Sequence, residues 1–229
     1  MRVDILTIFP EHFDPFLTHG MVERARRKGK LEVRITDLRA FTEDRHRSVD
    51  DRPYGGGPGM LFRPEPVFRA LEVLLGDGLD AAEATLVLLC PQGERLRQER
   101  LEDLAARKRL VLLCGRYEGY DERIVAGFPW LRLSVGDYVL SGGEVPAMAV
   151  VEGIARLLPG VLGHGQSARR ESFSEWAGGE GVDHPHFTRP SSYRGVEVPE
   201  VLLSGNHGEI EEWRRARARE AARARRASP

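Results

Sequence analysis

The sequence predicts an α/β protein whose mostly parallel sheet is covered by helices on both faces. Two apolar runs, Thr85 to Cys90 (TLVLLC) and Arg109 to Cys114 (RLVLLC), have the composition of buried strands. Segments with helical periodicity alternate with such runs, and this alternation is typical of parallel sheets. A glycine-containing loop follows each run, as expected at the carboxyl edge of an open sheet.

The first predicted elements are a strand over Val3 to Phe9 and a helix over about Glu11 to Arg27. Pro10 favours that helix because proline is tolerated in the first helical turn. Leu31 to Asp37 alternates apolar and polar residues and is predicted as a second strand. The polar segment 39–66 follows, and a connection this long is more often functional than idle.

The next predicted helix covers about Val67 to Leu75, and another, near Leu96 to Ala106, separates the two apolar runs. A shorter strand is predicted over Leu131 to Val135, followed by a helix over about Val145 to Leu158. Three strands therefore end in loops within about 50 residues, and we expect these loops to form one composite pocket.

The composition changes after Pro159. Residues 160–181 are rich in glycine, serine and charge, as expected of a mobile linker or lid. Asn206 and Glu209 have the spacing of a capping box, and the helix that they open carries seven arginines and one glutamate from Trp213 to Arg226. Such a helix is either a solvated or frayed face or a surface that contacts phosphates.

Bulk composition permits one large or two small domains in 229 residues with a net charge of −1. Only three of the 34 basic residues are lysine. Arginine suits bidentate phosphate recognition, although a GC-rich genome or a warm habitat also explains its abundance. Cys90 and Cys114 are predicted to be buried core thiols. The absence of a signal peptide or membrane-spanning stretch predicts a cytoplasmic protein.

Several standard sites are missing from the sequence. No strand is followed by GxGxxG, and neither GxxxxGK[ST] nor GxSxG occurs. The seven histidines are scattered; His184 and His186 are close, but no further ligand spacing predicts a metal. The remaining pocket of backbone and apolar groups suits a flat, neutral heterocycle. S-adenosylmethionine fits this description, because it carries an adenosine without phosphates.

The three loops belong to a set of eight sequence segments that are spread along the chain. In chain order they are Phe9-Pro10-Glu11, DDRPYGGGPGM at 50–60, CPQG at 90–93, CGRYEGYDER at 114–123, VGDYVLSGGEVPAM at 135–148, PGVLG at 159–163, PHFTRP at 185–190 and VPEVLLSGNHGEIEEWR at 198–214. Across essentially the whole chain they resemble the bacterial tRNA (guanine-N1)-methyltransferases, the TrmD type of the knotted SPOUT class.

The resemblance implies transfer of a methyl group from S-adenosylmethionine to N1 of guanosine 37 of tRNA. It also implies a homodimer in which the second subunit completes each active site. The expected organisation is a SAM-binding catalytic domain over residues 1–162 with a deep carboxyl-terminal trefoil knot, a linker or lid over 163–176, and a small helical tRNA-binding domain over 177–229. Generic folding rules alone would not predict a knot.

Residue by residue, the resemblance assigns cofactor binding to the three loops and to the helix that follows them. The cofactor-binding residues expected on this basis are Pro91, Gly93, Gly115, Tyr117, Glu118, Gly119, Ser134, Val135, Gly136, Asp137, Tyr138, Val139, Leu140, Gly142, Gly143 and Pro146. The expected RNA contacts are Arg189, Arg194, Arg214 and Arg215.

The resemblance also assigns the catalytic roles. The family's base is an aspartate in an E-D-S-F segment, which here reads Arg170-Glu171-Ser172-Phe173, so Glu171 is the expected base. Arg156 is expected to stabilise negative charge on the guanine O6. Arg170 replaces the acidic neighbour, which leaves open whether magnesium takes part. Two alternatives also stay open: a knotted methyltransferase for another RNA position, and an RNA-binding factor that has lost catalysis.

Overall fold

The computed structural model describes residues 1–76, 83–163, 171–174 and 181–227. The chain divides into two compact units, Met1–Leu162 and Gly163–Pro229. Most of the predicted linker 163–176, including Arg170, lies outside the described residues.

The first unit is built on a five-stranded sheet with strand order β2-β1-β6-β5-β7, in which every pairing is parallel. The mostly parallel sheet predicted from the sequence is therefore confirmed. Its strands are β1 (Arg2–Thr7), β2 (Glu32–Asp37), β5 (Ala84–Arg95), β6 (Arg109–Cys114) and β7 (Leu131–Ser134).

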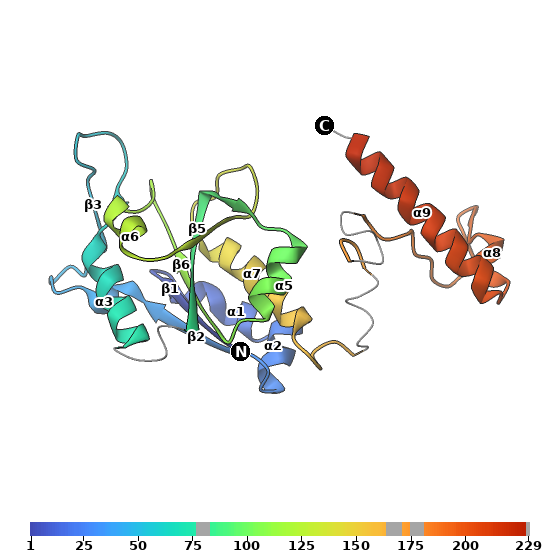
Figure 1. The fold of residues 1–229 in the computed structure, drawn as a ribbon, viewed down its shortest axis with the longest axis horizontal. Helices are drawn as coiled ribbons and strands as arrows, with labels where there is room; N and C mark the ends of the chain where they lie inside the picture. Colours follow the sequence, from blue (N-terminus) through green and yellow to red (C-terminus); the bar gives the residue numbers. More distant parts are fainter. Residues whose placement is uncertain (77–82, 164–170, 175–180, 228–229) are drawn as a thin grey trace. The chain divides into compact units, whose positions relative to one another are not determined.

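Helices cover both faces of this sheet (Figure 1). The helical elements of the first unit are η1 (Pro10–Phe13), α1 (Asp14–Leu17), α2 (Gly20–Arg27), η2 (Leu38–Phe41), α3 (Pro64–Leu75), α5 (Gln98–Ala105), α6 (Glu122–Gly127) and α7 (Glu144–Leu157). Helix α6 is absent from the sequence-based prediction, and its six residues are too few for a clear helical period.

Two cores follow from the alternation of side chains along the strands. Leu110 and Leu112 of β6 pack on one face with residues of α2, α5 and α7. Val111 and Leu113 of the same strand pack on the other face with residues of α3 and α6. All six residues of β6 are buried, which accounts for the continuous apolar run in its sequence.

The single helix predicted over about Glu11 to Arg27 is wrong, because the structure has η1, α1 and α2 in its place. The break falls at Thr18, whose hydroxyl donates to the carbonyl oxygens of Asp14 and Pro15 and so competes with helix continuation. Gly20 then adopts a φ of +69°, which redirects the chain into α2.

The strand predicted to end at Cys90 is longer, since β5 continues to Arg95. Its pairing with β7 shifts register between Leu89 and Glu94, so the Pro91-Gln92-Gly93 segment is a bulge inside a strand rather than a loop after one. Two pairs beyond the bulge, Glu94 with Leu133 and Arg95 with Ser134, fix the far end of the segment.

The glycine-rich segment after Asp50 is the tip of a short hairpin. Strands β3 (Asp50–Asp51) and β4 (Leu61–Phe62) pair in antiparallel fashion. Phe62 N donates to Gly119 O over 2.9 Å, and Glu118 N donates to Met60 O over 3.1 Å. The hairpin is therefore joined by backbone hydrogen bonds to the loop that follows β6.

The second unit contains β8 (Ser192–Tyr193), β9 (Val196–Glu197), α8 (Glu200–Leu203) and the long helix α9 (His207–Ala227). Asn206 caps α9 as predicted, because its side-chain oxygen accepts from the backbone N–H groups of Gly208 and Glu209. In a capping box the residue three positions on would accept a hydrogen bond from the N-cap backbone N–H. Here Asn206 N donates to Ser204 Oγ instead.

Across the described parts of both units, no helix is long and apolar enough to cross a membrane. The cytoplasmic location predicted from the sequence stays a prediction.

Candidate functional site

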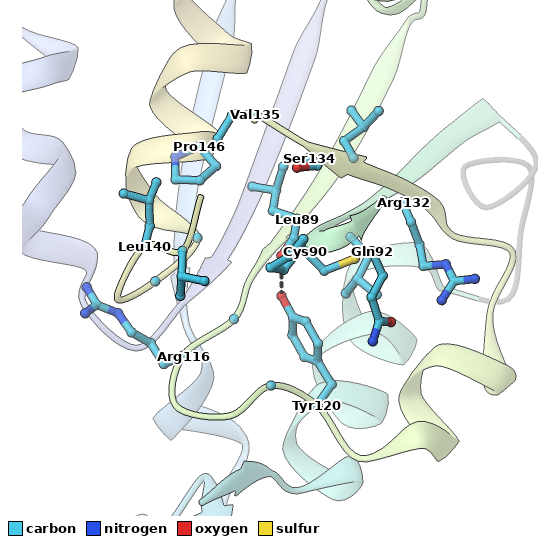
Figure 2. Close-up of a pocket in the computed structure, with 18 of the residues that line it drawn as sticks. Leu89, Cys90, Gln92, Arg116, Tyr120, Arg132, Ser134, Val135, Leu140 and Pro146 are labelled. Atoms are coloured by element: carbon cyan, nitrogen blue, oxygen red, sulfur yellow. Dashed lines mark hydrogen bonds between the residues drawn. The ribbon is translucent and has the colours of Figure 1, made fainter. Parts of the chain in front are cut away.

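A pocket of about 350 Å³ lies at the bulge of β5 and at the carboxyl ends of β6 and β7. Its walls come from the β5 bulge, from the loops that follow β6 and β7, and from the first turn of α7 (Figure 2). Neighbouring parallel strands end at the same edge of a sheet, so three segments remote in sequence converge here. The composite pocket expected from the sequence is present.

Most of the residues expected to bind a cofactor line this pocket. They are Pro91, Gly115, Tyr117, Glu118, Gly119, Ser134, Val135, Gly136, Tyr138, Val139, Leu140, Gly142, Gly143 and Pro146.

Gly93 and Asp137 do not line the pocket, so the structure does not place them with the other expected residues. Gly93 faces β7, where an added Cβ would collide with the backbone of Leu133; its role is close packing of two strands. The Asp137 carboxylate forms an ion pair with Arg95 on the exposed surface.

Other lining residues were not expected from the sequence. They are Leu88, Leu89, Cys90, Gln92, Arg116, Tyr120, Glu122, Val125, Arg132, Leu133 and Ser141. Six of them lie inside quoted motifs, so the sequence already carried a signal for them: Cys90, Gln92, Arg116, Tyr120, Glu122 and Ser141. The others, Leu88, Leu89, Val125, Arg132 and Leu133, are recognisable only once the strand order and the β5 bulge are known.

Tyr120 closes the floor of the pocket between two strands. Its hydroxyl lies 3.2 Å from Leu89 O, the bond drawn in Figure 2, and 3.2 Å from Leu113 O. Tyr120 is partly buried, and desolvation of its phenol raises the pKa of Tyr120 well above its usual range. Tyr120 therefore stays protonated and acts as a hydrogen-bond donor that ties β5 to β6.

Glu144, at the start of α7, is buried and carries a charge. Its Oε1 accepts a 2.7 Å hydrogen bond from Thr7 Oγ1, and its Oε2 lies 3.0 Å from Arg116 Nε. The second contact is an ion pair without hydrogen-bond geometry. The Arg116 guanidinium also lies over the Phe9 ring, 4.5 Å from its centroid. This network connects β1, the second loop and α7 behind the pocket.

Gly143 brings the third loop against the end of β6. Its N–H donates to Gly115 O over 2.8 Å, and a Cβ at position 143 would lie 2.7 Å from the Cα of Cys114. Real Cβ atoms do not approach backbone so closely, so only glycine fits at this crossing. The loop can thus pass beside β6 and present its backbone to the pocket.

The two cysteines differ in their surroundings. Cys114 is fully buried, as predicted, and burial raises the pKa of its thiol well above the usual range. The prediction that Cys90 is a core thiol is wrong, because Cys90 is only partly buried and lines the pocket. Cys90 packs against the edge of the core that contains Leu86 and Leu88, at the point where the pocket opens. Partial burial also raises the pKa of the Cys90 thiol.

Charges in the pocket are of both signs. Glu118 and Glu122 contribute carboxylates, and Arg116 and Arg132 contribute guanidinium groups. Arg116 is paired with Glu144, whereas within the described residues Arg132 has no hydrogen bond or ion pair and is exposed. The polar groups thus surround a space whose inner wall is backbone and apolar side chains.

Of the two expected catalytic residues, Arg156 belongs to the first unit but does not line this pocket. Arg156 lies in the last turn of α7, ten residues beyond the lining residue Pro146, which corresponds to about 15 Å along a helix axis. Glu171 belongs to the second unit, where its carbonyl accepts hydrogen bonds from the backbone and hydroxyl of Ser174.

The structure separates the four expected RNA contacts into two groups. Arg189 and Arg214 line one groove of the second unit. Arg194 instead lies over the Tyr193 ring, and Arg215 pairs with Glu211 at 3.2 Å. Their grouping was not visible in the sequence, because residues 189 and 214 are 25 positions apart.

One set of potential metal ligands is found among the described residues. Asp183, His184 and His186 have ligand atoms that lie within 4.8 Å of one another. His186 Nε2 already lies 3.1 Å from Asp183 Oδ2, and the backbone N–H of His184 donates to Asp183 Oδ1. These hydrogen bonds account for the cluster without an ion, and no function is assigned to it here.

Comparisons with known proteins match the whole chain. The family model described as "tRNA (Guanine-1)-methyltransferase TrmD" covers residues 1–228. A relative named tRNA (guanine-N(1)-)-methyltransferase from Moorella thermoacetica is 50% identical, over 96% of this chain and 86% of its own length. Relatives of the same name from Desulforudis audaxviator and Bacillus subtilis are 51% and 46% identical, over 95% and 93% of this chain and 85% and 86% of their own lengths.

Proposed function

The chain belongs to the TrmD family of tRNA (guanine-1)-methyltransferases, and from this premise we propose that it methylates N1 of guanosine 37 in tRNA, with S-adenosylmethionine as the methyl donor. The observation that carries the proposal is the pocket at the bulge of β5 and at the carboxyl ends of β6 and β7, into which fourteen of the sixteen residues expected to bind the cofactor converge.

The pocket suits S-adenosylmethionine chemically. Backbone groups of the loops after β6 and β7 lie open along its wall, where they are able to read the edge of an adenine ring. Apolar side chains such as Leu89, Leu140 and Pro146 offer surfaces for the flat base. The carboxylates of Glu118 and Glu122 favour a sulfonium cation nearby. Once bound, S-adenosylmethionine supplies the methyl group for transfer.

Glu171 is proposed as the general base. Guanine N1 is a poor nucleophile while it carries a proton, so a carboxylate has to take that proton as the new N–C bond forms. Glutamate brings the same carboxylate as the family's aspartate on a chain one methylene longer. The Glu171 side chain is partly buried, and its main chain is held in a turn by Ser174. The backbone of the segment must therefore compensate for the extra length.

Arg156 is proposed to stabilise the negative charge that grows on the guanine O6 when N1 loses its proton. Its distance along α7 from the pocket of its own chain supports a site shared between two subunits, in which one chain supplies the pocket and the other supplies Arg156. We therefore propose a homodimer with two composite active sites. Each site would depend on the arrangement of the dimer as well as on the fold of the chain.

A trefoil knot in the first unit is also part of the proposal. It is supported by the crossing at which Gly143 contacts the end of β6 and by the antiparallel bridge between Arg116 and Gly142. A knot of this kind would hold the third loop against the second and preform the cofactor pocket. No role is proposed for magnesium.

The second unit is proposed to be a helical tRNA-binding domain. Helix α9 carries the arginines noted in the sequence, and a helix surface with many guanidinium groups attracts phosphates. The affinity for tRNA should therefore fall steeply with salt. Guanosine 37 lies in a loop, from which a base is able to leave its stack at moderate cost.

The function is tested by incubating the purified protein with methyl-labelled S-adenosylmethionine and two tRNA transcripts, one with guanosine and one with adenosine at position 37. We expect 1-methylguanosine in the first transcript only. Label at another nucleotide would instead support a methyltransferase for a different RNA position. No label, with both ligands bound, would support an RNA-binding factor that has lost catalysis.

A further inference from the structure

A second cavity, of about 410 Å³, lies within the second unit. Its walls are the segment 184–191 and side chains from α8 and α9. Val198, Leu202 and Ile210 make part of the lining apolar. We call this cavity the unit-2 groove. It is distinct from the proposed cofactor pocket, because every residue that lines it belongs to the second unit.

The unit-2 groove presents an aromatic ring to solvent. Phe187 lines the groove and is 44% exposed. The Trp213 ring of α9 packs against it at a tilt of 56°, with ring centroids 6.4 Å apart. Phe187 is therefore an aromatic ring that is held by a neighbouring ring and partly open to solvent, as a stacking platform requires.

Two arginines line the same groove. Arg189 and Arg214 both contribute to its wall. The Nε of Arg214 is buried and, among the residues that the structure describes, finds no hydrogen-bond acceptor. The two guanidinium groups make the groove wall basic, which favours a phosphate there. The groove thus combines an apolar platform with cations.

One acidic residue, Asp183, is bonded to the groove wall. It accepts hydrogen bonds from the backbone of His184 and from the side chain of His186, both residues of that wall. Asp183 itself does not line the groove, and its single carboxylate is outnumbered by the guanidinium groups of Arg189 and Arg214. Arg194 and Arg215, by contrast, do not line the groove.

We propose that the unit-2 groove binds one unpaired nucleotide of the tRNA, whose base stacks on Phe187 while Arg189 and Arg214 contact its phosphate and base edge. This inference rests on the proposed tRNA substrate and adds a specific contact to it. Single-stranded nucleotides are commonly bound in this way, by aromatic stacking together with basic side chains. Duplex RNA offers no free base face, so a loop nucleotide is the expected occupant.

The test compares two exposed aromatic residues of the same unit. Phe187→Ala removes the platform, whereas Tyr193→Ala removes a ring that is 62% exposed and lies outside the groove. The dissociation constant of each full-length variant for a guanosine-37 tRNA transcript is measured at equilibrium without cofactor. We expect Phe187→Ala to bind about 10-fold more weakly, since one stacked base contributes about that much, and Tyr193→Ala to bind as the parent protein.

Two further variants separate stacking from general apolar contact and from folding. Phe187→Trp should restore the affinity, and Phe187→Leu should not, because only an aromatic face stacks. Arg214→Ala should reduce the slope of log K against log salt by about 1, and Phe187→Ala should leave that slope unchanged. Far-UV circular dichroism and thermal unfolding of each variant check that the second unit, which carries the substitutions, is folded.

Equal affinities of Phe187→Ala and Tyr193→Ala for tRNA would overturn the proposal, as would full affinity in Phe187→Leu. Because these measurements require no methyl transfer, they are independent of the catalytic assignment. A protein that binds tRNA through the groove but transfers no methyl group would refute the proposed activity alone.

Discussion

Glu171 is the residue where this chain differs most instructively from its expected family pattern. A carboxylate at position 171 is needed to accept the N1 proton, so Glu171→Gln should lower the methyl-transfer rate by at least about 100-fold, the usual contribution of a general base. Binding of S-adenosylmethionine and tRNA should be nearly unchanged. Single-turnover assays and equilibrium binding measure the two effects.

Glu171→Asp is the matched control, because it keeps the carboxylate and shortens the side chain to the family's length. We expect it to remain active. Full activity of Glu171→Gln would show that another group takes the proton.

Glu144 is a buried acidic residue whose desolvation cost is offset by its contacts with Arg116 and Thr7. Glu144→Ala would leave Arg116 without its partner and Thr7 without its acceptor, and breaking a buried pair typically costs about 3–5 kcal/mol. Since the Arg116 side chain is 17% exposed, we expect the lower end of this range. Urea unfolding measures the loss. Thr7→Val keeps the ion pair but removes two hydrogen bonds, the one donated to Glu144 Oε1 and the one accepted from Phe9 N, and should cost about 1–3 kcal/mol. A Glu144→Ala variant as stable as the parent protein would contradict this account.

The alkylation rate of the Cys90 thiol is a measure of how accessible the pocket is. Burial raises the pKa of its thiol, so at neutral pH the group is almost entirely the unreactive protonated form. Alkylation by iodoacetamide should be slow at pH 7 and accelerate as the pH rises above the ordinary thiol range. S-adenosylmethionine should slow it further by filling the pocket. Peptide mapping should find Cys90 modified and the fully buried Cys114 protected; protection of neither cysteine would count against the described pocket.

At the scale of elements, β6 and α9 were predicted more accurately than η1, α1 and α2. The observed limits of β6 agree with the predicted ones, because all six of its residues are buried and the residues on either side interrupt the apolar run. The helix predicted over about Glu11 to Arg27 failed because one hydroxyl, on Thr18, bonds locally and ends the helix. Such local competition is not visible in hydrophobic periodicity.

Helix α9 allows a prediction about RNA binding. A chain that ends before Trp213 would lose the seven arginines of its carboxyl-terminal part. It should bind tRNA more weakly and with a shallower salt dependence, because fewer phosphates are neutralised. Filter binding between 50 and 200 mM salt, a range in which such contacts change affinity strongly, measures the slope. Cofactor affinity is the control, and an unchanged slope would assign phosphate binding elsewhere.

At the scale of the whole molecule, the proposed shared site predicts complementation between two inactive variants. Arg156→Ala should lose turnover but keep its pocket. In Gly136→Val, the added side chain would meet the Tyr138 ring and should block cofactor binding. A mixed dimer would then contain one site with an intact pocket and an intact Arg156 from the other chain. Mixing and reassembly should restore about a quarter of the parent activity, since half the dimers are mixed and each has one good site.

Failure to recover activity, with mixed dimers shown to form, would place Arg156 in the site of its own chain. Equal losses of turnover and cofactor affinity in Arg156→Ala alone would point to a structural role for this residue.

Local patterns in the sequence were sufficient to predict the α/β class, most of the strands and the loops after β6 and β7, because strand and helix periodicities and glycine positions are local properties. They were also sufficient to place the chain among its relatives. The tertiary structure fixed the strand order, the bulge after Cys90, and the exclusion of Gly93 and Asp137 from the pocket. It alone joined Thr7 to Glu144 across 137 positions and brought Arg189 and Arg214 to one groove. These features depend on contacts between segments far apart in the chain, which no local pattern records.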